Sequence, residues 1–103
     1  MRTHELKCWP SFFAAVRDGS KTFEVRRNDR DFAVGDVLHL REWDPCGDRI
    51  EFGGRMRGVG DYTGADCKRV VTYVLRGGEF GIEAGFCVMG LAVPAAQGEA
   101  VKP

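Results

Sequence analysis

The feature that most constrains the fold is a pair of alternating runs between Gly19 and Trp43. Residues 22–26 and 37–43 place apolar side chains at every second position, which is the period of a β-strand. In the second run, Leu38 and Leu40 predict the face that points to the core. A polar loop and a Gly-Asp turn separate the runs, so the stretch predicts two short strands with a dense group of charged residues between them.

A single helix is expected ahead of these strands. Pro10 suits the first turn of a helix, where the missing N–H of proline costs nothing. Phe12, Phe13 and Val16 recur at helical spacing, and a glycine follows as a C-terminal stop. We therefore expect a helix at about residues 10–18.

Other segments predict further strands. Residues 3–7 are compatible with a short strand, and residues 67–75 are rich in β-branched and aromatic side chains. Residues 86–93 are apolar on both faces, which favours a central strand. One helix among five to six strands indicates an α+β chain whose sheet curls into a small barrel.

The 103 residues fit one domain. We expect a single domain at 1–94, a glycine-rich loop at 45–61, and a flexible tail at 95–103. Within the loop, the sequence leaves open a hairpin around Gly53 and Gly54, because it fixes no register there.

Composition excludes several classes of function. No apolar run reaches the ~20 residues that span a bilayer, and no signal peptide is evident, so we expect a cytoplasmic protein without a membrane partner. The 15 basic and 15 acidic residues balance, so a nucleic-acid surface is expected only as a local patch. The four cysteines form no Cys-x-x-Cys pair, so we expect reduced thiols, no metal and no cofactor.

Three motifs in the central stretch point to a family. They are G-x-K-T-x-E-x-R at 19–26, N-D-R-x-F at 28–32, and G-D-x-L-x-L-x-E followed by tryptophan at 35–43. Together they resemble the ASCH domains of the PUA-like superfamily, and within it a group of small uncharacterised bacterial and phage proteins. This resemblance implies a small PUA-like (ASCH) β-barrel of five to six strands with one main helix packed against it. It also implies a cleft beside the helix and the strand that follows, and against the family pattern residues 45–61 resemble a loop insertion.

Lys21, Glu24 and Arg26 are the main candidate site residues. Glu24 and Arg26 share one strand face, and Lys21 enters that strand from the preceding turn. From the charges alone, a solvated face with ion pairs worth ~0–1 kcal/mol each is favoured. The ASCH resemblance favours the cleft instead, so we expect the three side chains to converge on a partly buried pocket beside the helix.

An enzymatic alternative also follows from the resemblance. One ASCH branch hydrolyses the acetyl amide of N4-acetylcytidine with a lysine that matches Lys21, a threonine at the position of Glu24, and a distant glutamate, for which Glu79 and Glu83 are candidates. The missing hydroxyl weakens this hypothesis, and the hydroxyl of Thr22 lies at another position. In an enzyme, Lys21 and Glu24 would carry the acid–base chemistry.

Further residues are candidates for nucleic-acid contacts. Asn28 and Arg30 either bind a phosphate or base edge or form an Asx-type turn. Arg55 and Arg57 are candidates for phosphate contacts, and Tyr62 for base stacking. The other aromatic residues are more often part of the core in a small barrel: Trp9, Trp43 and Tyr73. The two histidines, His4 and His39, are more often structural residues than metal ligands.

The sequence therefore favours a small ASCH-type RNA- or nucleotide-binding module with a polar cleft. An amidohydrolase or another enzyme acting on a modified nucleoside or RNA is the alternative. A phage or bacterial protein-interaction module with a vestigial cleft, and hence a protein partner, is the third reading.

Overall fold

The computed structural model describes residues 1–46, 50–52, 55–57 and 60–95. Five strands form one sheet in the order β1-β3-β6-β7-β2, and two more form a separate antiparallel pair, β4-β5. The elements are β1 (Thr3–Cys8), α1 (Pro10–Asp18), β2 (Phe23–Arg27), β3 (Val37–Asp44), β4 (Ile50–Phe52), β5 (Arg55–Arg57), β6 (Asp61–Arg76) and β7 (Phe86–Ala92).

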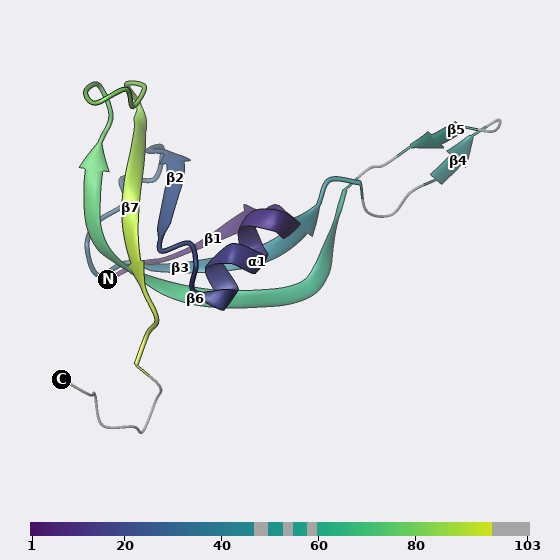
Figure 1. Cartoon of the computed structure of the whole chain (residues 1–103), viewed down its shortest axis with the longest axis horizontal. Coiled ribbons are helices and arrows are strands. Elements are labelled where there is room, and N and C mark those ends of the chain that lie inside the picture. Colours follow the sequence, from purple (N-terminus) through teal and green to yellow (C-terminus); the bar gives the residue numbers. More distant parts are fainter. Residues whose placement is uncertain (47–49, 53–54, 58–59, 96–103) are drawn as a thin grey trace.

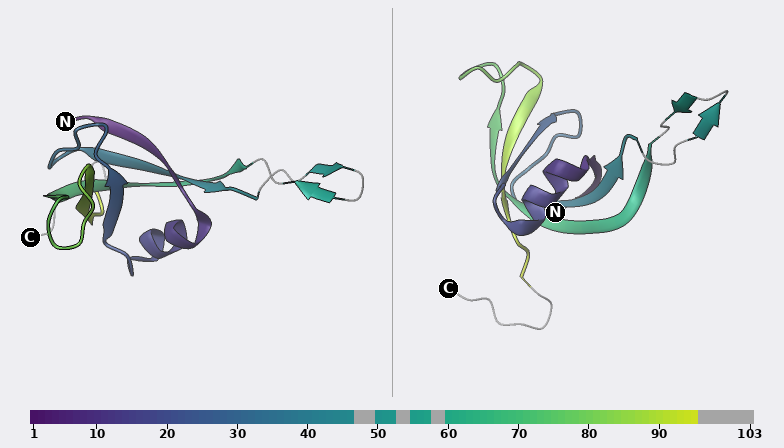
Figure 2. Two further views of the ribbon diagram at one scale, coloured as in Figure 1. Left: turned by 90° about the horizontal axis from the view of Figure 1, so that it is seen from above. Right: turned by 45° about the vertical axis from the view of Figure 1, so that its right-hand side comes forward.

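The main sheet curls around the helix (Figure 1). β1 runs parallel to β3, whereas the pairs β3–β6, β6–β7 and β2–β7 are antiparallel. The two ends of the sheet, β1 and β2, bend toward each other around α1, which is clearest in Figure 2. The result is an α+β fold with a barrel-like curl, and β7 lies inside the sheet as its two apolar faces predicted.

The helix occupies the predicted residues. Pro10 stands in its first turn, and Gly19 ends it in the left-handed conformation with φ 89°, donating its N–H to the carbonyl of Val16. Phe13 and Val16 are buried against the sheet. Just beyond the helix, the N–H of Lys21 donates to the carbonyl of Ala15 at 2.9 Å. This turn fixes the direction in which the chain enters β2.

The core lies between the helix and the inner face of the curl. β1, β3 and β7 each send alternate side chains into it, as their burial patterns show. Its buried apolar members are Leu6, Cys8, Phe13, Val16, Phe32, Leu38, Leu40, Val71, Cys87, Met89 and Leu91. Leu38 and Leu40 point inward as predicted, and Cys8 and Cys87 pack as small apolar residues.

Two segments differ from the sequence prediction. β6 begins at Asp61, whereas we predicted the strand only from residue 67. A register shift opposite Arg41 and Trp43 absorbs extra residues of β6, which hides the alternation in the sequence. Within 45–61, Ile50–Phe52 pairs with Arg55–Arg57, so the hairpin that the sequence left open is formed. Residues 96–103 of the predicted tail lie outside the described residues.

A buried carboxylate holds the turn before β3. Asp36 accepts hydrogen bonds from the imidazole of His4 at 2.9 Å and from the backbone N–H groups of Arg2 and Ala33, each at 3.1 Å. Burial opposes ionisation of Asp36, but these hydrogen bonds outweigh it and lower the pKa from 3.8 to about 2. His4 is therefore a structural histidine, as expected.

Candidate functional site

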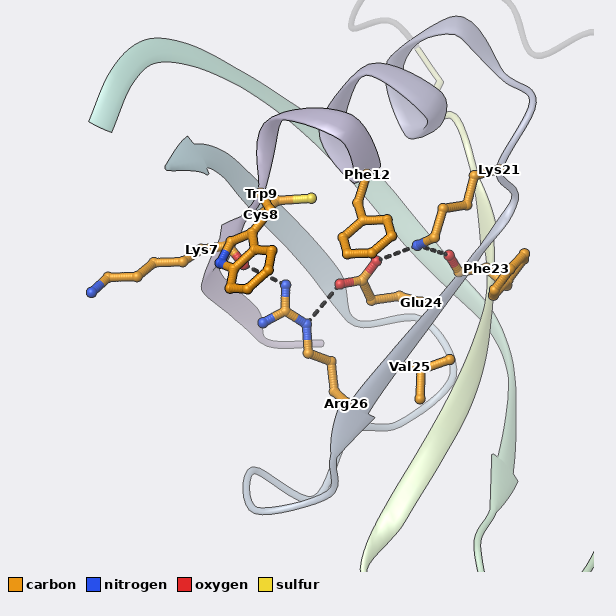
Figure 3. A pocket seen from close by; sticks show the side chains of 9 residues that line it. All are labelled: Lys7, Cys8, Trp9, Phe12, Lys21, Phe23, Glu24, Val25 and Arg26. Carbon is orange, nitrogen blue, oxygen red and sulfur yellow. Dashed lines mark hydrogen bonds and ion pairs between the residues drawn. The ribbon is translucent and has the colours of Figure 1, made fainter. Parts of the chain in front are cut away.

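A pocket of about 450 Å³ opens between the end of β1, the start of α1 and β2. It lies beside the helix, at the gap between the two edge strands of the sheet. Figure 3 shows the side chains that line it: Lys7, Cys8, Trp9, Phe12, Lys21, Phe23, Glu24, Val25 and Arg26. Its volume falls within the range of about 300–1,000 Å³ that is typical of small-ligand sites.

Glu24 forms the polar centre of this pocket. Its Oε1 accepts a hydrogen bond from the ammonium of Lys21 at 2.9 Å, and its Oε2 accepts one from Nε of Arg26 at 2.7 Å. The Glu24 side chain is only 6% exposed, whereas Lys21 and Arg26 retain 17% and 25%. The expectation that these three side chains converge beside the helix is confirmed.

β2 buries its polar face. Glu24 lies opposite Met89 of β7 and is buried, while Phe23 and Val25 point to the other side and are about half exposed. A carboxylate tolerates this position because each of its oxygens has a cationic donor. The ion pairs, and not hydropathy alone, therefore determine which face of β2 is buried.

Arg26 also joins the two edges of the sheet. Its guanidinium donates to the backbone carbonyl of Lys7 at 2.5 Å. Arg30 makes the equivalent contact two residues earlier in β1, donating to the carbonyl of Glu5 at 2.9 Å. In the described part of the chain β1 is an edge strand, and these two arginine side chains satisfy the edge carbonyls of Glu5 and Lys7.

Aromatic rings surround the polar centre. Trp9 and Phe12 are about half exposed, and Phe23 stands on the side of Lys21. The Lys21 ammonium lies 5.7 Å from the ring centroid of Phe12 and 4.8 Å from that of Phe23, within the range of cation–π contacts. The sequence analysis missed Phe12. Phe12, Val16 and Phe13 lie within about 100° of one another on a helix, so no sequence signal indicated that Phe13 is buried and the ring of Phe12 is half exposed.

Cys8 places a thiol at the inner wall of the pocket. Burial, and next the negative charge of Glu24, raise the pKa of this thiol from 9.0 to about 11. The thiol is therefore protonated near neutral pH and is a poor nucleophile.

Asn28 and Arg30 lie away from the pocket lining. Asn28 accepts a hydrogen bond from the N–H of Phe32 at 3.1 Å through its side-chain oxygen. Together with the contact of Arg30 to β1, this bond holds the loop between β2 and β3 against the sheet. In the structure both side chains contribute to holding this loop, and their contact with a ligand stays a prediction.

Tyr62 lies on β6, on the face of the sheet opposite the core. The Arg41 guanidinium stands 3.8 Å from the centroid of its ring, and the Lys7 ammonium 4.6 Å from that of Trp43. The structure does not bring Tyr62 to the pocket. Arg55 and Arg57 belong to β5, but their side chains lie outside what the structure describes.

The remaining candidates are also separate from the pocket. Glu79 and Glu83 are exposed in the turn between β6 and β7. His39 contacts Asp66 at 2.5 Å on the outer face of the sheet. Among the described residues, no three His, Cys, Asp or Glu side chains gather as metal ligands would. In the same part of the chain, no helix has the length and hydropathy needed to cross a bilayer.

Comparison with known proteins gives the family. The family model described as a domain of unknown function, DUF3850, matches residues 3–91, and the chain belongs to this family. It is similar to an uncharacterized 12.9 kDa protein in the GpA 3' region of Escherichia phage P2, with 40% identity over 42 residues. That match covers 41% of this chain and 38% of the length of the phage protein.

Proposed function

We propose that this protein is an ASCH-type, PUA-like module that binds RNA or a nucleotide in the pocket beside α1. The observation that carries the proposal is the placement of half-exposed aromatic rings, Trp9 and Phe12, around a pocket with a charged centre. Aromatic faces stack on unpaired bases, at about 1–3 kcal/mol per base, and nearby cations attract the phosphates.

The lining of the pocket supports binding more than hydrolysis. None of the described side chains that line it carries a hydroxyl group. The one thiol, Cys8, has a raised pKa, so it lacks the thiolate that a covalent step needs. Both oxygens of Glu24 already accept hydrogen bonds, which leaves this carboxylate poorly placed to take a proton from a substrate.

Binding can be measured with a fluorescently labelled single-stranded RNA by anisotropy at several salt concentrations. We expect affinity to fall with salt, with a slope of about −0.7 per phosphate contacted. Trp9→Ala and Phe12→Ala should each weaken binding by about 1–3 kcal/mol. Phe80→Ala is the matched control, because Phe80 is an exposed aromatic residue in the turn between β6 and β7.

Two results would argue against the proposal. Equal loss of affinity in the Phe80 control and the pocket variants would place the binding surface elsewhere. Cleavage of N4-acetylcytidine that disappears in Lys21→Ala would instead support the hydrolase alternative.

A further inference from the structure

The charges inside the pocket do not cancel. Lys21 and Arg26 contribute two positive charges and Glu24 one negative charge, which leaves one positive charge. Lys7 also lines the pocket, but its ammonium lies over the ring of Trp43. Figure 3 shows the Lys7 side chain pointing away from the other lining residues. A net positive pocket of this kind favours an anionic ligand.

The negative charge is also the least accessible of the three. Both oxygens of Glu24 are used by its partners, and its side chain is 6% exposed against 17% for Lys21 and 25% for Arg26. An ammonium has three donors and a guanidinium five. The described contacts of Lys21 go to Glu24 and to the carbonyl of Phe23, and those of Arg26 to Glu24 and the carbonyl of Lys7. Each cation therefore retains donor capacity for a ligand.

We infer that the pocket selects a ligand that carries a phosphate next to a planar base, and discriminates against the neutral nucleoside. Lys21 and Arg26 hold the phosphate, and an aromatic ring of Trp9 or Phe12 lies against the base. Glu24 is then a positioning residue, since it fixes both cations and does not itself contact the ligand. The inference rests on the proposed function, which it makes more specific by naming the charged group that is recognised.

The test compares adenosine, adenosine monophosphate and inorganic phosphate as ligands of the full chain by isothermal titration calorimetry. We expect the monophosphate to bind at least tenfold more tightly than adenosine at low salt, because charge-assisted hydrogen bonds to phosphate are about twice as strong as neutral ones. Added sodium chloride should reduce this difference. Inorganic phosphate should bind more weakly than the monophosphate, because it has no ring to stack.

A short oligoadenylate tests whether the bound phosphate and base belong to an RNA chain or to a free nucleotide. If it binds more tightly than the monophosphate, the phosphate belongs to an RNA chain. If it binds no more tightly, the ligand is a free nucleotide. Either result supports the inference, provided that the monophosphate exceeds adenosine.

Arg26→Gln should bring the affinity for the monophosphate closer to that for adenosine, with Lys21 still in place. Arg27→Gln is the matched control, because the Arg27 guanidinium lies 4.9 Å from the ring centroid of Phe86 and outside the pocket lining. The comparison of ligands on the unmodified protein does not depend on whether the Arg26 variant folds. Equal affinities for adenosine and its monophosphate would overturn the inference but not the proposed RNA- or nucleotide-binding function. If none of these ligands nor the RNA binds, the proposed function fails.

Discussion

Asp36 and Glu24 are both buried carboxylates, but they are satisfied in opposite ways. Asp36 accepts hydrogen bonds from an imidazole and from two backbone N–H groups, and the half-exposed Arg2 guanidinium adds an ion pair only at 3.5 Å. Glu24 accepts from the ends of two long side chains that remain partly exposed. The first arrangement fixes a turn, whereas the second holds two cations at the surface of a pocket. Burial of a charge therefore marks a structural site in one case and a candidate binding site in the other.

The largest difference between the two sites should appear in stability. Asp36→Ala leaves backbone donors and His4 without an acceptor inside the protein, and we expect it to lower the free energy of unfolding by about 3–5 kcal/mol. Glu24→Ala should cost about 1–2 kcal/mol, because Lys21 and Arg26 can turn to water. Urea denaturation measures both. Equal losses would show that Glu24 is as structural as Asp36.

A smaller effect is expected from acid. The pKa of Asp36 is about 2 in the fold against 3.8 ordinarily, so ionised Asp36 stabilises the protein fully above about pH 4. That contribution should disappear as the pH falls from about 4 through 2. Urea midpoints between pH 5 and pH 2 should therefore fall more steeply for the unmodified protein and for Glu24→Gln than for Asp36→Asn. A parallel fall in Asp36→Asn would rule out Asp36 as the source.

The smallest effect should be seen at Cys8. After burial, the charge of Glu24 is the next cause of the raised pKa of this thiol, while the charges of Arg26 and Lys21 lower it. Glu24→Gln should therefore lower the pKa of Cys8, and Asp36→Asn should leave it unchanged. The pH dependence of alkylation, followed at Cys8 by mass spectrometry, measures this shift. An unchanged profile in Glu24→Gln would mean that burial alone protects the thiol.

Much of the framework could be predicted from local patterns. The helix occupies 10–18, as predicted, because proline and glycine mark its two ends. The strand predicted at 37–43 is observed at Val37–Asp44, one residue longer. The convergence of Lys21, Glu24 and Arg26 followed from strand geometry and the family resemblance. These features depend on neighbours in sequence, which a single chain displays.

The parts that could not be predicted depend on distant contacts. Arg26 reaches the carbonyl of a residue 19 positions away, and Arg30 one that is 25 positions away. The early start of β6 depends on how it pairs with β3 around a bulge. On β2, hydropathy alone favours burying Phe23 and Val25, but the paired charges reverse the faces. The exposure of Phe12 has the same origin, because the packing of α1 against the sheet decides that Phe13 is buried and Phe12 is not.

The order of strands in the sheet has a consequence for how the chain folds. β2 carries Glu24 and Arg26, yet its strand partner in the sheet is β7, with Phe23 opposite Gly90. Because loop closure over such a separation costs entropy before any contact forms, we expect this pairing to form late. We therefore expect β2, and with it Glu24 and Arg26, to be held in place only after β7 has been made. β1, α1 and β3 are close in sequence and can assemble earlier, so we expect a ligand to find a complete site only after β2 has paired with β7.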